Sequence, residues 1–399
     1  MENIWLEEIR NRSSLGKPPV LSGRCDKLGR VGFNDLVFVP AQLSRQPVDY
    51  FRKKIRSETV IGSRSKKPLR LSVPIMFAGM SFGALSKEAK IAIARASTVL
   101  ETCTNTGEGG MLPDERKEAR LLVAQYSTGR FGVDDNYLRS GDAIEIKMGQ
   151  GAKPGQGGLL PKEKVTPEIV SVRKLPGQMD IHSPPRHMDI NKPSDLRKKV
   201  SMLRKKAVGK PIIIKIAAGH VDADVRIAVR ANPDVIAIDG MSGGTGAAPE
   251  VMLDDFGIPI LPAIVQARSV MDRLHAKQEL IVGGGFSKGA DIAKALALGA
   301  DAVFLGFPLM VAMGCTYCRM CYKGTCPKGI ATQDPKKRRK LKIDQASQSI
   351  VNYVTACSEE VKMAAGACGY DNVHDLSPED LRALDFNMSR ITGIKLVGD

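Results

Sequence analysis

The sequence predicts an α/β fold, a TIM-type (β/α)8 barrel with an N-terminal arm, a C-terminal cysteine-rich loop and a terminal helix. Short apolar runs recur eight times, and a helix-like stretch follows each of them. Several runs are apolar on both faces, as parallel strands buried on both sides require. Glycines collect directly after the runs, where barrel enzymes carry their binding loops. The predicted strands span residues 73–77, 102–104, 121–126, 143–147, 211–216, 235–238, 280–282 and 302–305.

The chain divides into four predicted segments. Residues 1–70 are polar without a sustained period, so we expect an arm that packs on the barrel, and residues 71–312 hold the barrel. Ser86 is the predicted N-cap of a helix over residues 86–100, and Gly299 ends one over residues 291–299. After Met313 the strand–helix rhythm stops, which predicts a loop over residues 313–342. The tail, residues 343–399, contains a predicted helix over residues 344–366.

Composition and charge exclude several classes of protein. Hydrophobic residues make up 43% and charged residues 26% of the 399 residues, as in ordinary globular proteins. No apolar run is long enough to span a bilayer, and the acidic N-terminus is not a signal peptide, so we expect a cytoplasmic protein without a membrane partner. The net charge of +16 arises from residues 1–70 and 313–342, which contribute +8 each. Aromatic residues at 5% are too few for base stacking, and no DNA-binding motif is present, so an acidic protein is a better partner than nucleic acid.

The cysteines fall into two groups. Four are isolated and are predicted to be buried as small hydrophobic residues: Cys25, Cys103, Cys357 and Cys368. The other four form C-x2-C-x2-C-x4-C followed by Pro327: Cys315, Cys318, Cys321 and Cys326. In a cytoplasmic chain, such crowding indicates an iron–sulfur cluster, with zinc as the alternative, rather than disulfides.

Glycine-rich loops follow most of the predicted strands. They lie at residues 105–110, 127–132, 149–158, 243–249 and 283–285, and Gly306 follows the last strand. Backbone amides without side chains can cradle a phosphate, and barrels build that cradle after the seventh and eighth strands. Together the loops predict a phosphorylated cofactor.

The motifs resemble the flavin-binding synthase domain of glutamate synthase, here in a stand-alone form. The residues that carry the resemblance are SFGALS at 81–86, NTGEGG at 105–110, QGAKPG at 150–155 with GG at 157–158, GGTGA at 243–247, and the cysteines of the loop with GIATQ at 329–333. The resemblance covers about residues 68–333 and implies FMN on a TIM barrel beside a [3Fe-4S] cluster. It also implies reductive amination of 2-oxoglutarate, through 2-iminoglutarate, to L-glutamate.

The resemblance implies a set of site residues. Lys153 and Arg173 are the expected substrate-binding cations, because a dicarboxylate needs fixed positive charge and the arginine fork matches a carboxylate. Gln150 is expected to assist them, and Glu108 to lie near the reacting centre. Lys215 is similar to the flavin-contacting lysine of the family. The full set of expected cofactor-binding residues is Met80, Ser81, Asn105, Gln150, Lys215, Asp239, Gly243, Gly244, Thr245, Gly284, Gly285 and Gly306.

The cysteine spacing leaves the type of cluster open. Cys315, Cys321 and Cys326 reproduce the spacing of the family, and three thiolates suit [3Fe-4S]. Cys318 departs from that pattern and makes the run similar to a bacterial ferredoxin motif, so a [4Fe-4S] cluster is the alternative. The basic run at residues 336–340 is a candidate docking surface for an acidic electron donor.

The sequence contains neither a glutaminase domain nor a nicotinamide-binding G-x-G-x-x-G unit. We therefore expect ammonia from a separate glutaminase subunit, and electrons from ferredoxin or from an NAD(P)H-oxidising subunit, with a homo-oligomer as a further expectation. Two other functions stay open: an N-methylglutamate synthase subunit that uses methylamine, and a non-catalytic electron-transfer subunit that holds flavin and cluster.

Overall fold

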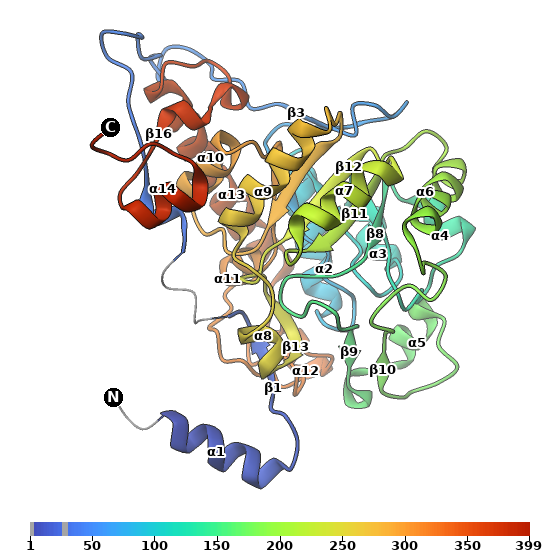
Figure 1. Ribbon diagram of the computed structural model, residues 1–399. Helices are drawn as coiled ribbons and strands as arrows, with labels where there is room; N and C mark the ends of the chain where they lie inside the picture. The colour runs from blue at the N-terminus through green and yellow to red at the C-terminus, as the bar shows by residue number, and fades with distance from the viewer. Residues whose placement is uncertain (1–3, 26–30) are drawn as a thin grey trace.

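A computed structural model describes residues 4–25 and 31–399, and an eight-stranded parallel barrel forms its centre (Figure 1). The strands pair in the order β5-β15-β14-β12-β11-β8-β7-β6. The two strands at the ends of this order, β5 and β6, lie next to each other and close the barrel, and we call this junction the seam. There the Thr102 hydroxyl donates a hydrogen bond to the Ile75 carbonyl. The predicted barrel is confirmed. Its strands are β5 (Ile75–Phe77), β6 (Cys103–Asn105), β7 (Leu121–Tyr126), β8 (Ala143–Lys147), β11 (Ile212–Ala217), β12 (Val235–Asp239), β14 (Glu279–Gly283) and β15 (Ala302–Leu305).

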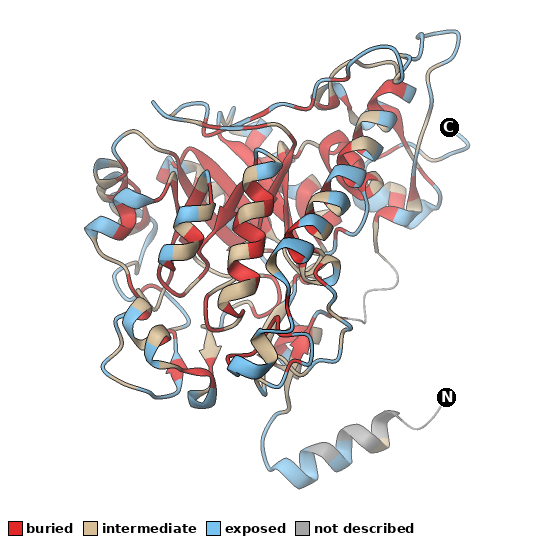
Figure 2. Ribbon diagram, turned by 180° about the vertical axis from the view of Figure 1, so that it is seen from behind, coloured by how far each residue is buried: buried red, intermediate tan, exposed pale blue. Residues whose placement is uncertain are grey.

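The strands are buried on both faces, which explains their continuous apolar character. Ile213 and Ile281 belong to the cluster inside the barrel, whereas Ile144, Ile214 and Ile236 pack outward under the helices. In Figure 2 the strands and the inward sides of the surrounding helices are red, and the outward sides are pale blue. Each predicted strand overlaps an observed one, because a strand enclosed on both sides leaves a clear apolar run in the sequence.

The helices between the strands cover the barrel. The Ser86 hydroxyl accepts a hydrogen bond from the Ala89 amide at 3.2 Å and caps α2 as predicted. Gly299 has a φ of +100°, which suits a glycine just beyond the end of α10. The helices that follow the strands are α2 (Lys87–Val99), α3 (Pro113–Glu118), α4 (Asp135–Ser140), α6 (Pro193–Ala207), α7 (Val221–Ala231), α8 (Glu250–Asp254), α9 (Ile260–Arg273), α10 (Gly289–Ala297) and α11 (Phe307–Ala312). Of these, α8 packs against β1 and β13, and a helix of the tail, α13 (Ile343–Ala367), packs against α2 and α10.

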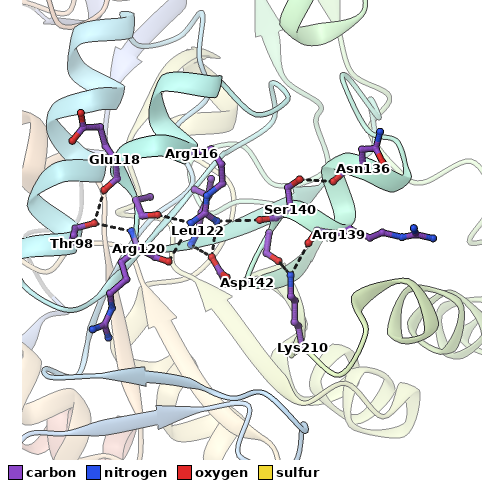
Figure 3. A network of polar contacts seen from close by, with 12 residues as sticks. Thr98, Arg116, Glu118, Arg120, Leu122, Asn136, Arg139, Ser140, Asp142 and Lys210 are labelled. Carbon is purple, nitrogen blue, oxygen red and sulfur yellow. Dashed lines mark hydrogen bonds and ion pairs between the residues drawn. The ribbon is translucent and has the colours of Figure 1, made fainter.

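A polar network ties together the N-terminal ends of neighbouring strands (Figure 3). The Asp142 carboxylate, just before β8, accepts hydrogen bonds from the Leu122 amide at 2.8 Å and from Arg116 Nη1 at 2.7 Å. Arg116 also donates to the Ser140 carbonyl at 3.1 Å, and Lys210 Nζ donates to the Arg139 carbonyl at 2.7 Å. Polar groups at this end of a barrel contribute to stability, whereas ligands bind at the opposite end.

The N-terminal region contributes three short pairings. Strand β1 (Val20–Gly23) pairs with β13 (Thr245–Pro249), β2 (Leu36–Phe38) pairs with β16 (Leu381–Ala383), and β3 (Thr59–Ile61) pairs with β4 (Leu69–Leu71). Helix α1 (Ile4–Leu15) projects away from the barrel (Figure 1). Helix α1 lies in the segment that shows no sustained period, so the sequence pattern does not predict it. Residues 243–249, expected as a glycine loop, contain β13 because β1 supplies hydrogen-bond partners from a distant part of the chain.

Two further regions frame the C-terminal end of the barrel. The chain between β8 and α6 forms an excursion with β9 (Leu159–Leu160), β10 (Ile181–His182), the 3-10 helix η2 (Lys162–Lys164) and α5 (Pro167–Arg173). Residues 314–334 are irregular, and α12 (Pro335–Arg338) follows. The tail contains α13 (Ile343–Ala367), predicted as 344–366, then η3 (Val373–Asp375), η4 (Pro378–Asp380) and α14 (Phe386–Thr392), and η1 (Phe33–Asp35) lies in the arm. No helix in residues 4–25 and 31–399 combines the length and the apolar character of a membrane span.

Candidate active site

One large pocket opens at the C-terminal ends of the barrel strands. It encloses about 1890 Å³ of empty space, including open solvent at its mouth, and residues from the barrel loops, the excursion after β8 and the cysteine-rich loop line it. The residues predicted for substrate, cofactor and metal come together here: Met80, Ser81, Glu108, Gln150, Lys153, Arg173, Lys215, Asp239, Gly243, Gly244, Thr245, Gly284, Gly285, Gly306, Cys315, Cys318, Cys321 and Cys326.

Asn105 is the exception among the predicted residues. It is buried at the end of β6 and is absent from the pocket lining. Its Oδ1 atom accepts a hydrogen bond from the Gly107 amide at 2.9 Å, which shapes the loop that carries Glu108. Its buried Nδ2 atom has no hydrogen-bond partner among the described residues. In this structure Asn105 supports the pocket from behind.

Glycines form one wall of the pocket. Gly284 follows β14 with a φ of +103°, and a Cβ atom there would lie 2.6 Å from the Gly240 carbonyl oxygen. Only glycine therefore fits where the loops after β12 and β14 approach each other. Gly243, Gly244 and Gly306 lie on the same wall. Backbone this free of side chains can approach a phosphate closely.

Lys147, at the end of β8, links two of the predicted residues. Its Nζ atom donates to Glu108 Oε2 at 2.7 Å and to Gln150 Oε1 at 2.8 Å. Burial disfavours the charged form of Glu108, but the charges of Lys147, Lys153 and Arg173 outweigh it and lower the pKa of this carboxyl group. The other carboxylate oxygen, Oε1, is buried without a hydrogen-bond partner among the described residues. Glu108 is therefore an anion with one oxygen bound by Lys147 and the other buried next to Gly158 without a hydrogen-bond partner among the described residues.

Lys153 lies deep in the pocket, with 5% of its surface exposed. Its Nζ atom donates one hydrogen bond, at 2.8 Å, to the Ala247 carbonyl of β13. Burial lowers the pKa of Lys153 to about 8, the charge of Lys147 acts in the same direction, and Glu108 opposes both. An amine in this position can bind an anion and titrates near neutral pH.

Arg173 enters the pocket from α5. Its Nη2 atom donates to the Phe82 carbonyl at 2.7 Å and to Ser81 Oγ at 3.3 Å, and its Nε atom donates to the same carbonyl at 3.3 Å. Burial lowers the pKa of Arg173 to about 10, with Glu108 opposing. The guanidinium thus both fastens the loop after β5 and contributes positive charge to the pocket.

Lys215, at the end of β11, sits on the barrel floor of the pocket. Its Nζ atom lies 3.7 Å from Glu145 Oε1, which also accepts a hydrogen bond from Gln125 Nε2 at 2.7 Å. Burial opposes the charge of Lys215, but Glu145 and Asp239 outweigh burial and raise its pKa. Lys215 is therefore a fixed cation beside the glycine wall.

Sequence reasoning missed Lys147, Gln125 and Glu145. They lie within β7 and β8, where the apolar residues around them dominate the pattern. The available signal was their position, because a polar residue near the C-terminal end of a barrel strand points to the site.

The four clustered cysteines line the outer part of the same pocket. Cys326 is buried, Cys315 and Cys321 are half-buried, and Cys318 is exposed; none forms a disulfide. The Tyr317 amide donates to Cys315 Sγ at 3.5 Å. Burial raises the pKa of the Cys321 thiol to about 11, Cys326 adds to this, and Lys164 opposes it. Across the described residues, no three His, Cys, Asp or Glu side chains are grouped as a single-ion site requires. The four isolated cysteines are buried, as predicted.

The sequence matches a known family over most of its length. The profile described as "conserved region in glutamate synthase" matches residues 29–371. A glutamate synthase large subunit-like protein from Rhizobium meliloti is 39% identical, with 100% of this chain and 94% of the relative covered. Archaeal-type glutamate synthase [NADPH] from Thermotoga neapolitana is 38% identical, over 92% of this chain and 78% of the relative. Archaeal glutamate synthase [NADPH] from Archaeoglobus fulgidus is 36% identical, over 99% of this chain and 83% of the relative.

Solved structures share the fold at much lower sequence identity. Flavocytochrome b2 with sulfite bound has a TM-score of 0.58 at 16% identity, covering 94% of this chain and 82% of that one. A mandelate oxidase variant with 2-hydroxy-phenylacetamide has a TM-score of 0.58 at 18% identity, covering 91% of this chain and 92% of that one. These similarities support the barrel alone. The family profile and these relatives match nearly the whole chain. This chain therefore belongs to the glutamate synthase family and is an oxidoreductase.

Proposed function

We propose that this chain is the FMN- and iron–sulfur-dependent synthase subunit of a glutamate synthase, which reductively aminates 2-oxoglutarate to L-glutamate. The observation that carries the proposal is the convergence of two buried cations, Lys153 and Arg173, and the carboxylate of Glu108 in one pocket. A dicarboxylate substrate needs such fixed cations, and an amination needs a group that can take a proton from the incoming amine.

The pocket residues fit FMN. The glycine wall around Gly284 offers open backbone to a phosphate, and Lys215 supplies a buried positive charge beside it. One structural relative, a mandelate oxidase variant with a TM-score of 0.52 at 19% identity, is described with an FMN adduct. Gly243, Gly244, Thr245 and Gly306 complete the proposed FMN-binding set on this wall.

The cysteine-rich loop fits an iron–sulfur cluster. Its donors are four thiols on one side of the pocket, without disulfides, and soft thiolate sets select iron–sulfur clusters or zinc. Cys315, Cys321 and Cys326 are the proposed ligands of a [3Fe-4S] cluster, and Cys318 is available as a fourth ligand for [4Fe-4S]. When bound, the flavin supplies a hydride and the cluster supplies single electrons.

The protein residues orient the substrate and handle its protons. The Lys153 ammonium group donates one hydrogen bond to the Ala247 carbonyl, and its other N–H groups bind an anionic or carbonyl oxygen of 2-oxoglutarate. Arg173 lines the same pocket as Lys153 and adds a second positive charge for the substrate. Lys147 fixes Glu108 through Oε2. Oε1, which has no hydrogen-bond partner among the described residues, is the proposed acceptor of the proton that the nitrogen loses as ammonia adds to the carbonyl carbon, and it returns this proton to the oxygen that leaves as water.

The charge of Lys153 makes substrate binding pH-dependent. Its pKa of about 8 means that the ammonium form dominates below pH 8 and disappears above it. The affinity for the 2-oxoglutarate dianion is therefore full below pH 8 and falls as the pH rises through that value, by up to about tenfold per pH unit. Titration of the oxidised flavoprotein with 2-oxoglutarate, followed by flavin absorbance without ammonium, measures this. The Lys153→Arg variant is expected to move the break to higher pH; an affinity that stays flat to about pH 9.5 in the wild type would contradict the assignment.

Exposed cations within residues 313–342 form the proposed docking surface for an acidic electron donor. They are Lys323, Lys328, Lys336, Arg339, Lys340 and Lys342. Arg338 is not part of this surface, because it is paired with Glu88 at 2.7 Å. Electrostatic steering by such a patch accelerates encounter with an oppositely charged partner. A separate glutaminase subunit is the proposed source of ammonia.

Charge reversal at Lys336, Arg339 and Lys340 together is expected to slow reduction by a plant-type ferredoxin about tenfold at low salt. The reason is loss of steering, so the difference should shrink as salt screens the charges. Stopped-flow flavin reduction measures the rate, and dithionite reduction should be unchanged. Reversal of three exposed cations on α6, Arg197→Glu, Lys198→Glu and Lys205→Glu together, is the control with the same change in net charge. Equal slowing by the control, or no slowing by the triple variant, argues against this surface.

The amine substrate separates the proposal from its two alternatives. The holoprotein is reduced anaerobically, and the return of flavin absorbance is followed with 2-oxoglutarate and either ammonium or methylamine. Faster reoxidation with ammonium supports the glutamate synthase assignment. Faster reoxidation with methylamine supports an N-methylglutamate synthase subunit. Reoxidation with neither amine, in protein that contains flavin and cluster, supports a non-catalytic electron-transfer subunit.

A further inference from the structure

Lys164 is a buried lysine where the pocket meets the cysteine-rich loop. It ends the 3-10 helix η2, has 4% of its surface exposed and lines the pocket. Its Nζ atom donates to the carbonyls of Ala84 and Cys321, both at 3.1 Å. The ammonium group is thus anchored to the backbone of one of the four clustered cysteines.

The side chain of Lys164 also packs along that loop. Gly324 lies between Cys321 and Cys326, and a Cβ atom there would lie 3.0 Å from Lys164 Cγ and 3.4 Å from Cδ. The φ of Gly324 is +68°, so the loop turns tightly over the lysine stem. Packing and hydrogen bonds together fix the position of the charge.

Among the residues that the structure describes, no carboxylate compensates the charge of Lys164. Lys90 pairs with Glu115 at 2.7 Å, and Lys215 lies 3.7 Å from Glu145, but no ion pair joins Lys164 to an Asp or Glu among the described residues. Nζ binds the Cys321 carbonyl and the stem packs under Gly324, so thiolates of Cys321 and Cys326 that bind a cluster would supply the missing negative charge, while Arg173 repels Lys164. Buried charges require a partner, and here the partner is on the loop.

We propose that Lys164 is the counter-charge of the iron–sulfur cluster, holding the cluster in its loop and raising its reduction potential. This rests on the proposed function, since it places a cluster on these cysteines. One electron from the donor makes the cluster one unit more negative, and no bond at Lys164 forms or breaks. A fixed positive charge stabilises the reduced form more than the oxidised form, so its removal makes reduction harder.

The test compares Lys164→Met and Lys164→Arg with Lys162→Met in the full-length holoprotein. Lys162 lies on the same 3-10 helix but is exposed, so it controls for loss of a lysine in this segment. Three readouts are needed: iron and acid-labile sulfide per chain, the cluster's EPR spectrum, and its midpoint potential in a mediated redox titration. None of them depends on catalytic activity.

Under the proposal, Lys164→Met shifts the midpoint to a lower potential or loses cluster, whereas Lys164→Arg and Lys162→Met retain wild-type values. An unchanged midpoint in Lys164→Met with full cluster content overturns the proposal. Cluster loss in both Lys164→Met and Lys164→Arg also overturns it, because packing rather than charge is then the cause. Absence of cluster from the anaerobically prepared wild type is a different result: it removes the cluster from the proposed function itself.

Discussion

Replacing Lys153 with methionine is expected to lower the rate of flavin reoxidation by 2-oxoglutarate and ammonium by about 10²-fold or more. Lys153 is buried and lines the pocket. Its ammonium group donates one hydrogen bond to the Ala247 carbonyl, which leaves its other N–H groups for the substrate. Methionine fills a similar volume but neither binds an anion nor donates a hydrogen bond. Single-turnover reoxidation of the reduced holoprotein measures the loss.

The variant must be separated from a misfolded protein. Flavin content, cluster content and the rate of dithionite reduction should match those of the wild type. Lys198→Met, on the exposed side of α6, is the control for removal of one lysine and is expected to be silent. If Lys153→Met reoxidises at the wild-type rate with saturating 2-oxoglutarate, Lys153 does not act on the reacting substrate.

Replacing Lys90 with methionine is expected to destabilise the protein by about 3–5 kcal/mol, because it leaves Glu115 buried without its partner. The Lys90–Glu115 pair spans 2.7 Å, and the two side chains are 1% and 0% exposed. Lys90 Nζ also donates to the carbonyls of Met80, Asn105 and Thr106, which hold the loops after β5 and β6 at the barrel seam. The midpoint of urea unfolding measures the change.

A second variant identifies the cause. Lys90→Met combined with Glu115→Leu removes the unpaired carboxylate and is expected to recover part of the lost stability, since an apolar pair can replace a buried ion pair. Lys87→Met on the same helix loses two more exposed ion pairs, with Asp114 at 2.7 Å and with Glu168 at 3.0 Å, and should shift the midpoint little. An unfolding midpoint for Lys90→Met equal to that of Lys87→Met would show that the buried pair does not stabilise the seam.

The barrel could be predicted because its strands carry local patterns. β7, β8 and β15 coincide with the predicted ranges, and Ser86 marked the start of α2 through its capping role. The convergence of the candidate site residues in one pocket could be predicted because the loops after parallel strands meet at one end of a barrel.

The remaining features depend on contacts between distant segments. The pairing of β1 with β13 joins residues more than 200 positions apart, and no local pattern marks it. Arg173 was expected to hold substrate, yet two of its nitrogens bind the Phe82 carbonyl, which the sequence could not indicate. Lys164 stands in a polar stretch, and no local pattern there predicts that it is buried. Its burial against Cys321 arises only when the excursion after β8 folds onto the cysteine-rich loop.

A single-turnover labelling experiment tests the central claim most directly. Anaerobically reduced holoprotein is mixed with 2-oxoglutarate and ¹⁵N-ammonium, and labelled glutamate is quantified by mass spectrometry while flavin absorbance is followed. The account predicts close to one ¹⁵N-glutamate per flavin, formed as the flavin reoxidises, and none when either substrate is omitted. Reduced flavin that persists with both substrates present, and no labelled glutamate, would contradict the assignment of this pocket to reductive amination.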